Sequence, residues 1–407
     1  MTHFGIICPA STGHLNTMLP LGRELQRRGH RATLFGILDT QPQTLAAGLD
    51  FRAIGESEFP TGWIAQRDTQ QGKLSGLAGM RYSISWLQQT ITTFLREASE
   101  AMREVGVEAL VVDQISPDGA TVAEFLKLPF VSVCSAVLLN REDSVPPIYT
   151  PWSYNTSWFG RLRNRAGYAL LDRLTQPVWK VLNEYRRQCN LPLYSRHYRP
   201  YSQLAQVSQQ PAEFEFPRQH LPEYFHFTGP YHDSASRKPV SFPYQKLTGQ
   251  PLIYASMGTL QNRQQEIFQC MASACDGLDA QLVISLGGAL SPESLPGLPG
   301  SPLVVGYAPQ LELLKKTTLT ITHAGLNTVL ESLTNGVPMV AIPITNDQPG
   351  VAARLAWSGA GESVPLSRLS ASRLRAAIQQ VLTEDSYKNN ASRLQDAIAR
   401  AGGVRRA

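Results

Sequence analysis

The chain has 407 residues, of which 43% are hydrophobic and 17% are charged, and its formal net charge is +5. This length predicts two or three domains or one large α/β unit, and the apolar content excludes global disorder. The weakly basic charge gives no support to a nucleic-acid binder, because such proteins carry a concentrated basic face.

The sequence also bears on the cellular compartment. No uninterrupted apolar run reaches the roughly 18 residues of a transmembrane helix, and the apolar run at the start is too short for a signal peptide. The five cysteines are scattered and form no Cys-x-x-Cys pair, which is typical of reduced thiols. We therefore expect a cytoplasmic protein.

The first half of the chain consists of strand–helix–strand units. An apolar run at 4–8 predicts a strand, which is followed by a small-residue loop and a helical pattern that ends at Gly29. Residues 31–37 predict a second strand. A similar unit has strands at 109–112 and 130–134 around a helix at 118–128. Repeated units of this kind predict a parallel sheet with helices on both faces.

A polar stretch rich in proline and glycine then interrupts the pattern, and we expect domains at 1–228 and 251–384 with a linker at 229–250. Strands resume at 252–256, 281–286, 303–307, 319–322 and 338–344, and a last helix at 385–407 is expected to pack back on the first domain. The prediction is two Rossmann-like, doubly wound α/β domains that face each other across a cleft. Ligands bind at the carboxyl ends of such strands, so a substrate should bridge both halves.

The stretch from 306 to 348 carries the most specific pattern. A buried strand at 319–322 leads through a turn into a helix, and glycine in the turn lets the backbone approach a ligand. The free N–H groups and positive dipole end of the helix, with His, Asn and Thr side chains, suit a phosphate. Taken singly, Asn327 or Thr328 could merely cap the helix. The combined motifs are Tyr307-Ala-Pro-Gln310, His323-Ala-Gly-Leu-Asn-Thr-Val-Leu-Glu331, Gly336-Val-Pro338 and Asp347-Gln348.

These motifs, in this order, resemble the nucleotide-sugar signature of the family 1 glycosyltransferases, the UDP-glycosyltransferases of GT-B fold. The resemblance implies a UDP-sugar donor, with Tyr307 and Ala308 at the uracil, Gln310 and Glu331 at the ribose, and Asp347 and Gln348 at the sugar hydroxyls. The diphosphate would meet His323, Gly325, Asn327 and Thr328, and a second phosphate loop would contain Gly258 and Thr259. Ser135 matches a position that reaches the sugar's 6-hydroxyl. Tyr307 and Leu326 stand where many plant members have tryptophan.

A candidate general base is His14, in the loop before the first helix. Histidine suits proton removal near neutral pH, although a lone loop histidine is more often structural. A base also needs an orienting carboxylate, and Asp113 ends a strand at the same edge of the predicted sheet, with Asp118 as the fallback. The resemblance implies that His14 and Asp113 form the catalytic pair of an inverting transfer. It implies no metal ion and no cofactor besides the UDP-sugar co-substrate.

Other stretches resemble one bacterial branch of the family, whose members glucosylate hydroxylated carotenoids such as zeaxanthin. They lie at 111–120, 128–134, 139–142, 254–261 and 347–352. The implied donor is UDP-glucose, and the implied acceptor is a lipophilic diol that could be glucosylated once or twice. Another small aglycone, such as a polyphenol, a macrolide or a sterol, remains an alternative. Position and apolar character make Trp63, Trp86 and Ile115 candidate acceptor contacts.

Residues 151–200 are strongly basic. They contain nine lysines and arginines against two acidic residues, with Trp152, Trp158 and Trp179 among them. Apolar residues recur at helical spacing from Leu171 to Tyr185. Such a stretch could lie on the inner face of an anionic membrane, or it could be a solvated basic face above an ordinary core helix.

The sequence leaves two rival functions open and disfavours a third. A nucleotide-sugar epimerase of the same fold would not need the base at His14. A non-catalytic nucleotide-sugar or carotenoid binding protein would have lost the base or the phosphate site, whereas the residues for both are present. A Rossmann dehydrogenase is disfavoured, because the first loop lacks Gly-x-Gly-x-x-Gly.

Overall fold

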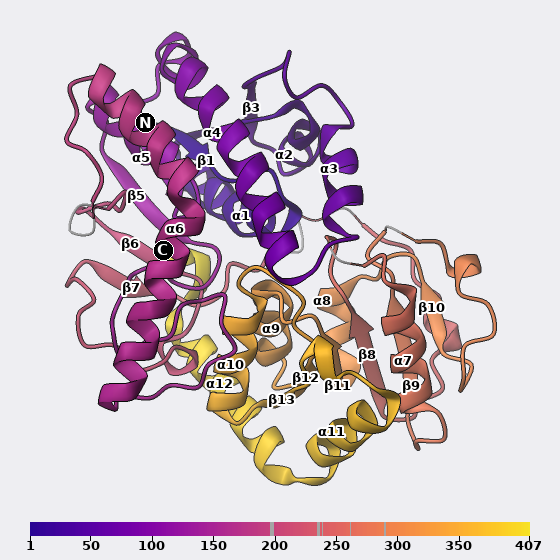
Figure 1. Ribbon diagram of the computed structural model, residues 1–407. Helices are drawn as coiled ribbons and strands as arrows, with labels where there is room; N and C mark the ends of the chain where they lie inside the picture. The colour runs from indigo at the N-terminus through magenta and orange to yellow at the C-terminus, as the bar shows by residue number, and fades with distance from the viewer. Residues whose placement is uncertain (196–198, 234–236, 238, 261, 289) are drawn as a thin grey trace.

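Two parallel sheets organise the chain (Figure 1), and the computed structural model describes all residues except 196–198, 234–236, 238, 261 and 289. The first sheet has the order β3-β2-β1-β4-β5-β6-β7, and its described strand pairs are parallel. Its strands are β1 (His3–Ile7), β2 (Arg31–Gly36), β3 (Asp50–Ala53), β4 (Ala109–Asp113), β5 (Phe130–Cys134), β6 (Gln206–Ser208) and β7 (Phe225–Phe227).

The second sheet repeats this plan with the order β10-β9-β8-β11-β12-β13, also through parallel pairs. Its strands are β8 (Leu252–Ser256), β9 (Gln281–Ser285), β10 (Leu303–Val305), β11 (Thr317–Thr322), β12 (Met339–Ala341) and β13 (Gly361–Ser363). In each sheet the chain reverses its winding direction beside the first strand, as in a doubly wound fold. The predicted pair of Rossmann-like domains is confirmed.

Helices cover both sheets. The first domain carries α1 (Thr12–Arg27), α2 (Gln41–Ala46), α3 (Trp63–Gln71), α4 (Gly76–Val105), α5 (Pro117–Leu126) and α6 (Trp158–Gln188). The second carries α7 (Gln265–Cys275), α8 (Gln310–Leu313), α9 (Leu326–Thr334), α10 (Gln348–Ser358), α11 (Ala371–Thr383) and α12 (Asp385–Ala401). The two longest helices, α4 and α6, pack against each other along the first domain. No described helix is long and apolar enough to span a bilayer.

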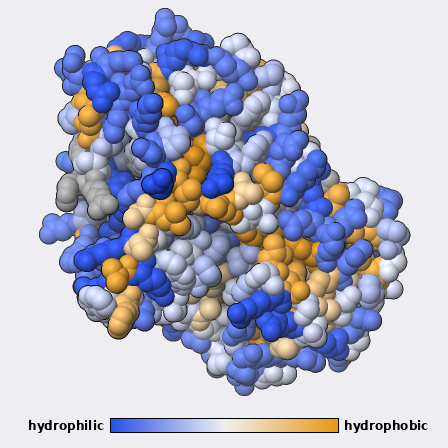
Figure 2. Space-filling model, in the orientation of Figure 1, coloured by the Kyte–Doolittle hydropathy of each residue, from blue (hydrophilic) through white to orange (hydrophobic). Residues whose placement is uncertain are grey.

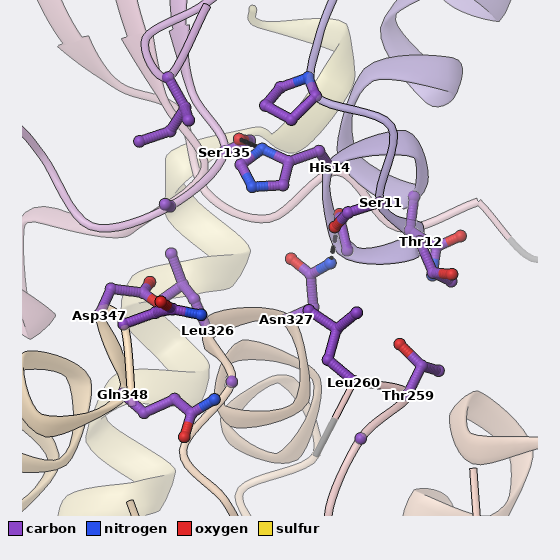
Figure 3. Close-up of a pocket in the computed structure, with 18 of the residues that line it drawn as sticks. Ser11, Thr12, His14, Ser135, Thr259, Leu260, Leu326, Asn327, Asp347 and Gln348 are labelled. Carbon is purple, nitrogen blue, oxygen red and sulfur yellow. Dashed lines mark hydrogen bonds between the residues drawn. The ribbon is translucent and has the colours of Figure 1, made fainter. Parts of the chain in front are cut away.

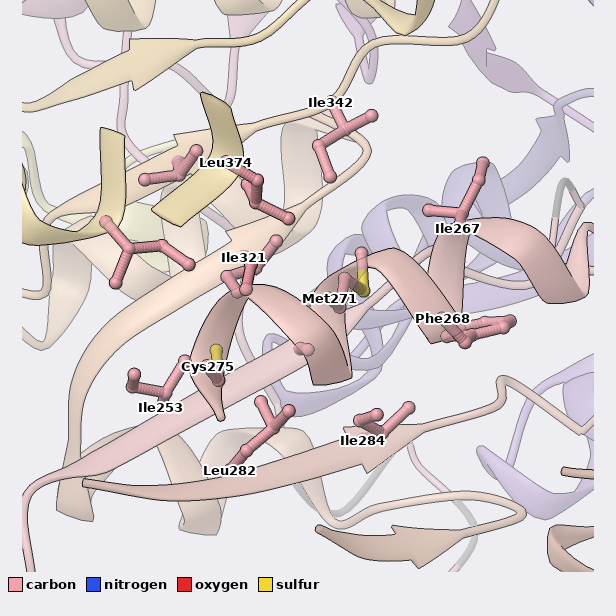
Figure 4. Packing of buried hydrophobic residues seen from close by; sticks show 14 of the residues in the cluster. Ile253, Ile267, Phe268, Met271, Cys275, Leu282, Ile284, Ile321, Ile342 and Leu374 are labelled. Atoms are coloured by element: carbon pink, nitrogen blue, oxygen red, sulfur yellow. The ribbon is translucent and has the colours of Figure 1, made fainter. Parts of the chain in front are cut away.

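A hydrophobic core holds the strands of the second domain whose following loops line the site. Figure 4 shows isoleucines of β8, β9 and β11 packed against Phe268, Met271 and Cys275 of α7, with Leu374 of α11 on the same cluster. Every residue of β8 is buried, as expected for a strand covered on both faces. The loops after β8 and β11 therefore start from rigid positions.

Two strands are shorter than predicted. The strand predicted at 303–307 ends at Val305 (β10), and the strand predicted at 338–344 covers only 339–341 (β12). Pro343 follows β12 closely, and proline has no N–H for a ladder hydrogen bond. At the other end of the chain, α12 packs on α9, and the turn after it contacts the first domain. There the backbone N–H of Gly403 donates to the carbonyl of Thr228 at 2.6 Å.

Candidate active site

A cavity of about 1680 Å³ lies between the two sheets and is lined by both domains. Its walls include the loops after β1 and β5 on one side and those after β8, β11 and β12 on the other (Figure 3). The carboxyl ends of β1 and β4, and of β8 and β11, are the points where the winding direction reverses, and ligands bind at such points.

His14 and Asp113 form the centre of the first-domain side. Nδ1 of His14 lies 2.7 Å from Oδ2 of Asp113, and the Asp113 side chain is fully buried. The hydroxyl of Ser135 contacts both partners, lying 2.7 Å from Nδ1 of His14 and donating to Oδ2 of Asp113. Because a carboxylate only accepts hydrogen bonds, Nδ1 of His14 carries the proton and Nε2 keeps its lone pair. This arrangement suits a general base.

The pKa of His14 reflects two opposing influences. Burial lowers this pKa, but the charge of Asp113 and its hydrogen bond outweigh burial, so the pKa is raised above its ordinary value. Asp118, the fallback partner, lies in the first turn of α5, where burial raises its own pKa to about 7. The carboxylate in contact with His14 is that of Asp113.

On the second-domain side, the ring of His323 packs between two glycines. A Cβ at Gly325 would lie 2.5 Å from Nε2 of this ring, and one at Gly258 would lie 2.5 Å from Cε1. Gly258 also has a φ of +69°, which side chains rarely adopt. Burial lowers the pKa of His323 to about 4, so the ring is neutral near pH 7. A neutral imidazole at this loop can donate a hydrogen bond without adding charge.

Asn327, at the start of α9, connects the two sides of the cavity. Its Nδ2 donates to the carbonyl of Gly13 at 2.8 Å (Figure 3), and its Oδ1 accepts from Nε2 of Gln209 at 2.9 Å and from the hydroxyl of Thr17 at 3.3 Å. A residue predicted at the diphosphate thus contacts the first turn of α1. His14 lies in this turn, so the prediction that it stands in a loop before the helix is wrong. Sequence reasoning missed Gln209, because no local motif surrounds it.

At the predicted nucleoside end, Glu331 is held by two side chains. Nε2 of Gln310 donates to it at 2.6 Å, and Arg237 pairs with both carboxylate oxygens. Burial raises the pKa of Glu331, but Arg237 outweighs burial and the net effect lowers it. Arg237 was missed, because it stands in the proline-rich stretch predicted as a linker. Tyr307 keeps 44% of its surface exposed at the rim, and Ala308 is buried beside it.

At the predicted sugar end, Asp347 lies near His14. Burial raises the pKa of Asp347, and the charge of His14 opposes this effect. Oε1 of Gln348 accepts from the backbone N–H groups of Ile344 and Thr345 at 2.8 and 3.0 Å, which fixes the loop before α10. The cavity is also lined by Gly258, Thr259, Gln310, Gly325, Thr328 and Ser135, so it brings together the residues predicted for the donor.

The acceptor candidates divide into two groups. Trp86 and Ile115 line the cavity, whereas Trp63 does not. The ring of Trp63 packs edge-on against Phe59, with 4.9 Å between ring centroids, and it lines a second depression that shares Trp86 with the cavity. An apolar wall that the sequence did not assign to the cavity comes from α6, through Tyr168, Leu171, Thr175, Val178 and Trp179. Within the described part of the chain, no cluster of three or more His, Cys, Asp or Glu side chains could hold a metal ion.

Comparisons with known proteins identify the family of the chain. The family model described as "UDP-glucoronosyl and UDP-glucosyl transferase" matches residues 63–398. The chain is 32% identical to "Zeaxanthin glucosyltransferase" of Pantoea ananas, covering 99% of this chain and 94% of that protein. It is 31% identical to the protein of the same name from Pseudescherichia vulneris, covering 100% and 96%.

Solved structures show the same fold at lower identity. A calicheamicin glycosyltransferase has a TM-score of 0.76 at 22% identity, covering 100% of this chain and 96% of that chain. A spinosyn rhamnosyltransferase complexed with spinosyn aglycone has a TM-score of 0.69 at 20% identity, covering 100% and 98%. The chain therefore belongs to the UDP-glycosyltransferase family, whose members transfer a sugar from a nucleotide donor to an acceptor.

Proposed function

We propose that this enzyme transfers glucose from UDP-glucose to a hydroxyl of a lipophilic acceptor, a hydroxylated carotenoid such as zeaxanthin, with inversion at the anomeric carbon. One observation carries the proposal: the His14–Asp113 pair opens onto the same cavity as the loops that resemble the family's nucleotide-sugar signature. The two relatives above, at 32% and 31% identity over nearly the whole chain, are named for this reaction.

In the proposed reaction, Nε2 of His14 takes the proton of the acceptor hydroxyl. The acceptor oxygen attacks the anomeric carbon from the side opposite the diphosphate, the new C–O bond forms, and the bond between the sugar and the diphosphate breaks. Asp113 holds the imidazole in the correct tautomer and stabilises the imidazolium that forms. UDP departs with the bonding electron pair.

Negative charge grows on the diphosphate as UDP leaves. The backbone N–H groups at the start of α9 and the side chains of Asn327 and Thr328 would face this charge, with the neutral ring of His323 beside them. Asp347 and Gln348 would hold the sugar hydroxyls. These groups supply the stabilisation that a divalent cation supplies in metal-dependent transferases.

The acceptor assignment also has support from the cavity. Leu171, Val178 and Trp179 of α6 and Trp86 of α4 line its first-domain side. An apolar wall of this kind suits a long hydrocarbon better than a polar aglycone.

The decisive assay supplies UDP-glucose together with zeaxanthin, a flavonoid or a steroid in detergent micelles, and identifies products by mass. We expect one or two hexose additions on zeaxanthin. Hexose on the flavonoid or steroid alone would replace the carotenoid with another aglycone, and no hexose on zeaxanthin would refute the carotenoid acceptor while leaving glycosyl transfer itself standing.

His14→Ala separates the remaining rivals. It should abolish transfer while UDP still binds. If conversion of the UDP-sugar without acceptor persisted in this variant, the enzyme would be an epimerase.

A further inference from the structure

The start of α6 exposes an unusual set of large apolar side chains. Trp158 is 68% exposed, Phe159 is 75% exposed, and Leu162 and Leu170 are each about half exposed. In Figure 2, hydrophobic residues colour the projecting tip at the lower left, where Figure 1 shows the beginning of α6. Exposed apolar groups gathered in this way mark interaction sites.

The start of α6 is stabilised by a helix cap, a tight turn and an aromatic contact. The hydroxyl of Ser157 accepts from the backbone N–H of Gly160 and caps the helix. A Cβ at Gly160 would lie 2.3 Å from the carbonyl of Asn155, so the chain turns tightly onto the helix. Trp158 and Phe159 pack edge-to-face, with 4.8 Å between ring centroids. The two aromatic rings thus contact each other at the capped start of the helix while facing solvent.

Cations accompany these apolar side chains on the exposed side of α6. Arg161, Arg165, Arg173 and Lys180 are exposed. Of the nearby acids, Asp143 pairs with Arg165 at 2.6 Å, and Asp172 pairs with Arg141 from a neighbouring loop at 2.8 Å. Arg196, counted in the basic window of the sequence, lies outside the described residues. The exposed side of α6 thus keeps a positive balance beside its aromatic tip.

We propose that this α6 surface, formed by Trp158, Phe159, Arg161, Leu162, Leu170 and Arg173, docks on an anionic lipid bilayer. The rings and leucines would enter the boundary between headgroups and acyl chains, and the arginines would meet lipid phosphates. A lipid surface fits better than a protein partner, because arginines next to tryptophan and phenylalanine along one helix match the layered chemistry of a membrane interface.

The helix that would dock on the bilayer also forms a wall of the cavity. Tyr168, Leu171, Thr175 and Val178 of the same helix line the cavity on its other side. Docking would bring the cavity wall against the bilayer, where a lipophilic acceptor is dissolved. This last step rests on the proposed function, whereas membrane binding itself does not.

The test is co-sedimentation of the whole protein with vesicles of phosphatidylcholine alone or with about 30% phosphatidylglycerol, the anionic headgroup being the source of charge. We expect strong binding only to the anionic vesicles, weakened by added salt. The double variants Trp158→Ser/Phe159→Ser and Arg161→Glu/Arg173→Glu should each lose at least about tenfold in binding, since the first removes apolar surface that enters the interface and the second reverses two charges that face the lipid phosphates. Leu204→Ser and Arg373→Glu are matched controls at exposed sites elsewhere and should bind as the parent does.

Equal binding to both vesicle types, no binding, or full binding by both double variants would overturn the proposal. So would a dimer in light scattering that the Trp158→Ser/Phe159→Ser variant lacks, because the surface would then join two copies of the chain. Both variants should still transfer glucose to an acceptor in detergent micelles. Vesicle binding needs no acceptor, so a failure of the carotenoid proposal would leave this result intact.

Discussion

The protonation of His14 should set the pH dependence of turnover. The base works only when deprotonated, so kcat/KM should rise with pH through a pKa above the ordinary value of 6.5. Asp113→Asn removes the charge that raises this pKa and leaves the burial that lowers it. The acid limb of the profile should then move to lower pH, while the maximal rate falls by about 10⁴-fold.

Asp118→Asn is the matched control for this profile. Asp118 is buried near the same strand, but Asp113 is the carboxylate that contacts His14. The acid limb should therefore stay in place in Asp118→Asn. A limb that moved in this variant and not in Asp113→Asn would reverse the assignment of the orienting carboxylate.

Arg237 should control the pH dependence of donor binding. Without its charge, burial raises the pKa of Glu331, and a protonated carboxyl is a poorer acceptor for ribose hydroxyls. Arg237→Ala should raise the KM for UDP-glucose by about tenfold at pH 6 and by less at pH 8, because higher pH restores the carboxylate. An equal change at both pH values would mean that Arg237 acts in another way.

At the scale of secondary structure, α6 separates the cavity from solvent. Leu171 lines the cavity, whereas its neighbour Leu170 points to the outside and is 52% exposed. Leu171→Trp should therefore reduce transfer to the bulky acceptor by at least about tenfold and leave UDP affinity, measured by calorimetry, unchanged. Leu170→Trp should leave both unchanged with acceptor in micelles. Similar losses in the two variants would argue against a wall function of α6.

Individual strands and helices show which parts of the fold and of the site can be predicted from the sequence. Buried parallel strands are apolar runs bounded by glycine and proline, so β5 and β8 were predicted with their observed bounds. The residues around His323 were predicted as a group, because one turn between a strand and a helix holds them together. Arg237 and the wall of α6 join the cavity only when distant segments fold together, and periodicity does not report such contacts. The apolar character of Trp63 also does not indicate on which side of α3 its ring packs.

At the scale of the whole molecule, a buried ion pair joins the domains. Nε and Nη2 of Arg354 on α10 donate to Glu215 of the first domain at 2.9 and 2.6 Å, and both side chains are almost fully buried. Arg354→Met would leave the carboxylate without this partner, which costs about 3–5 kcal/mol. We expect calorimetry to show a Tm lower by about 10 °C. Arg393→Met, at a more exposed arginine of α12, should change the Tm by much less.

The entire reaction should proceed without a divalent cation. The proposed stabilisation of the departing diphosphate comes from backbone N–H groups and uncharged side chains around α9. Transfer in excess EDTA should equal transfer in buffer. Loss of activity in EDTA with recovery in magnesium would contradict the mechanism.

The contacts between the domains differ along the interface. On the α10 side, a Cβ at Gly350 would come within 2.1 Å of the carbonyl of Ile148, next to the buried Arg354–Glu215 pair. On the α3 side, the domains meet through hydrogen bonds such as Arg263 to Thr69 at 3.1 Å. If the two domains moved apart while the Arg354–Glu215 pair stayed intact, the motion would be a hinge rotation about the α10 side of the interface. The cavity would then widen most at the edge beside α3.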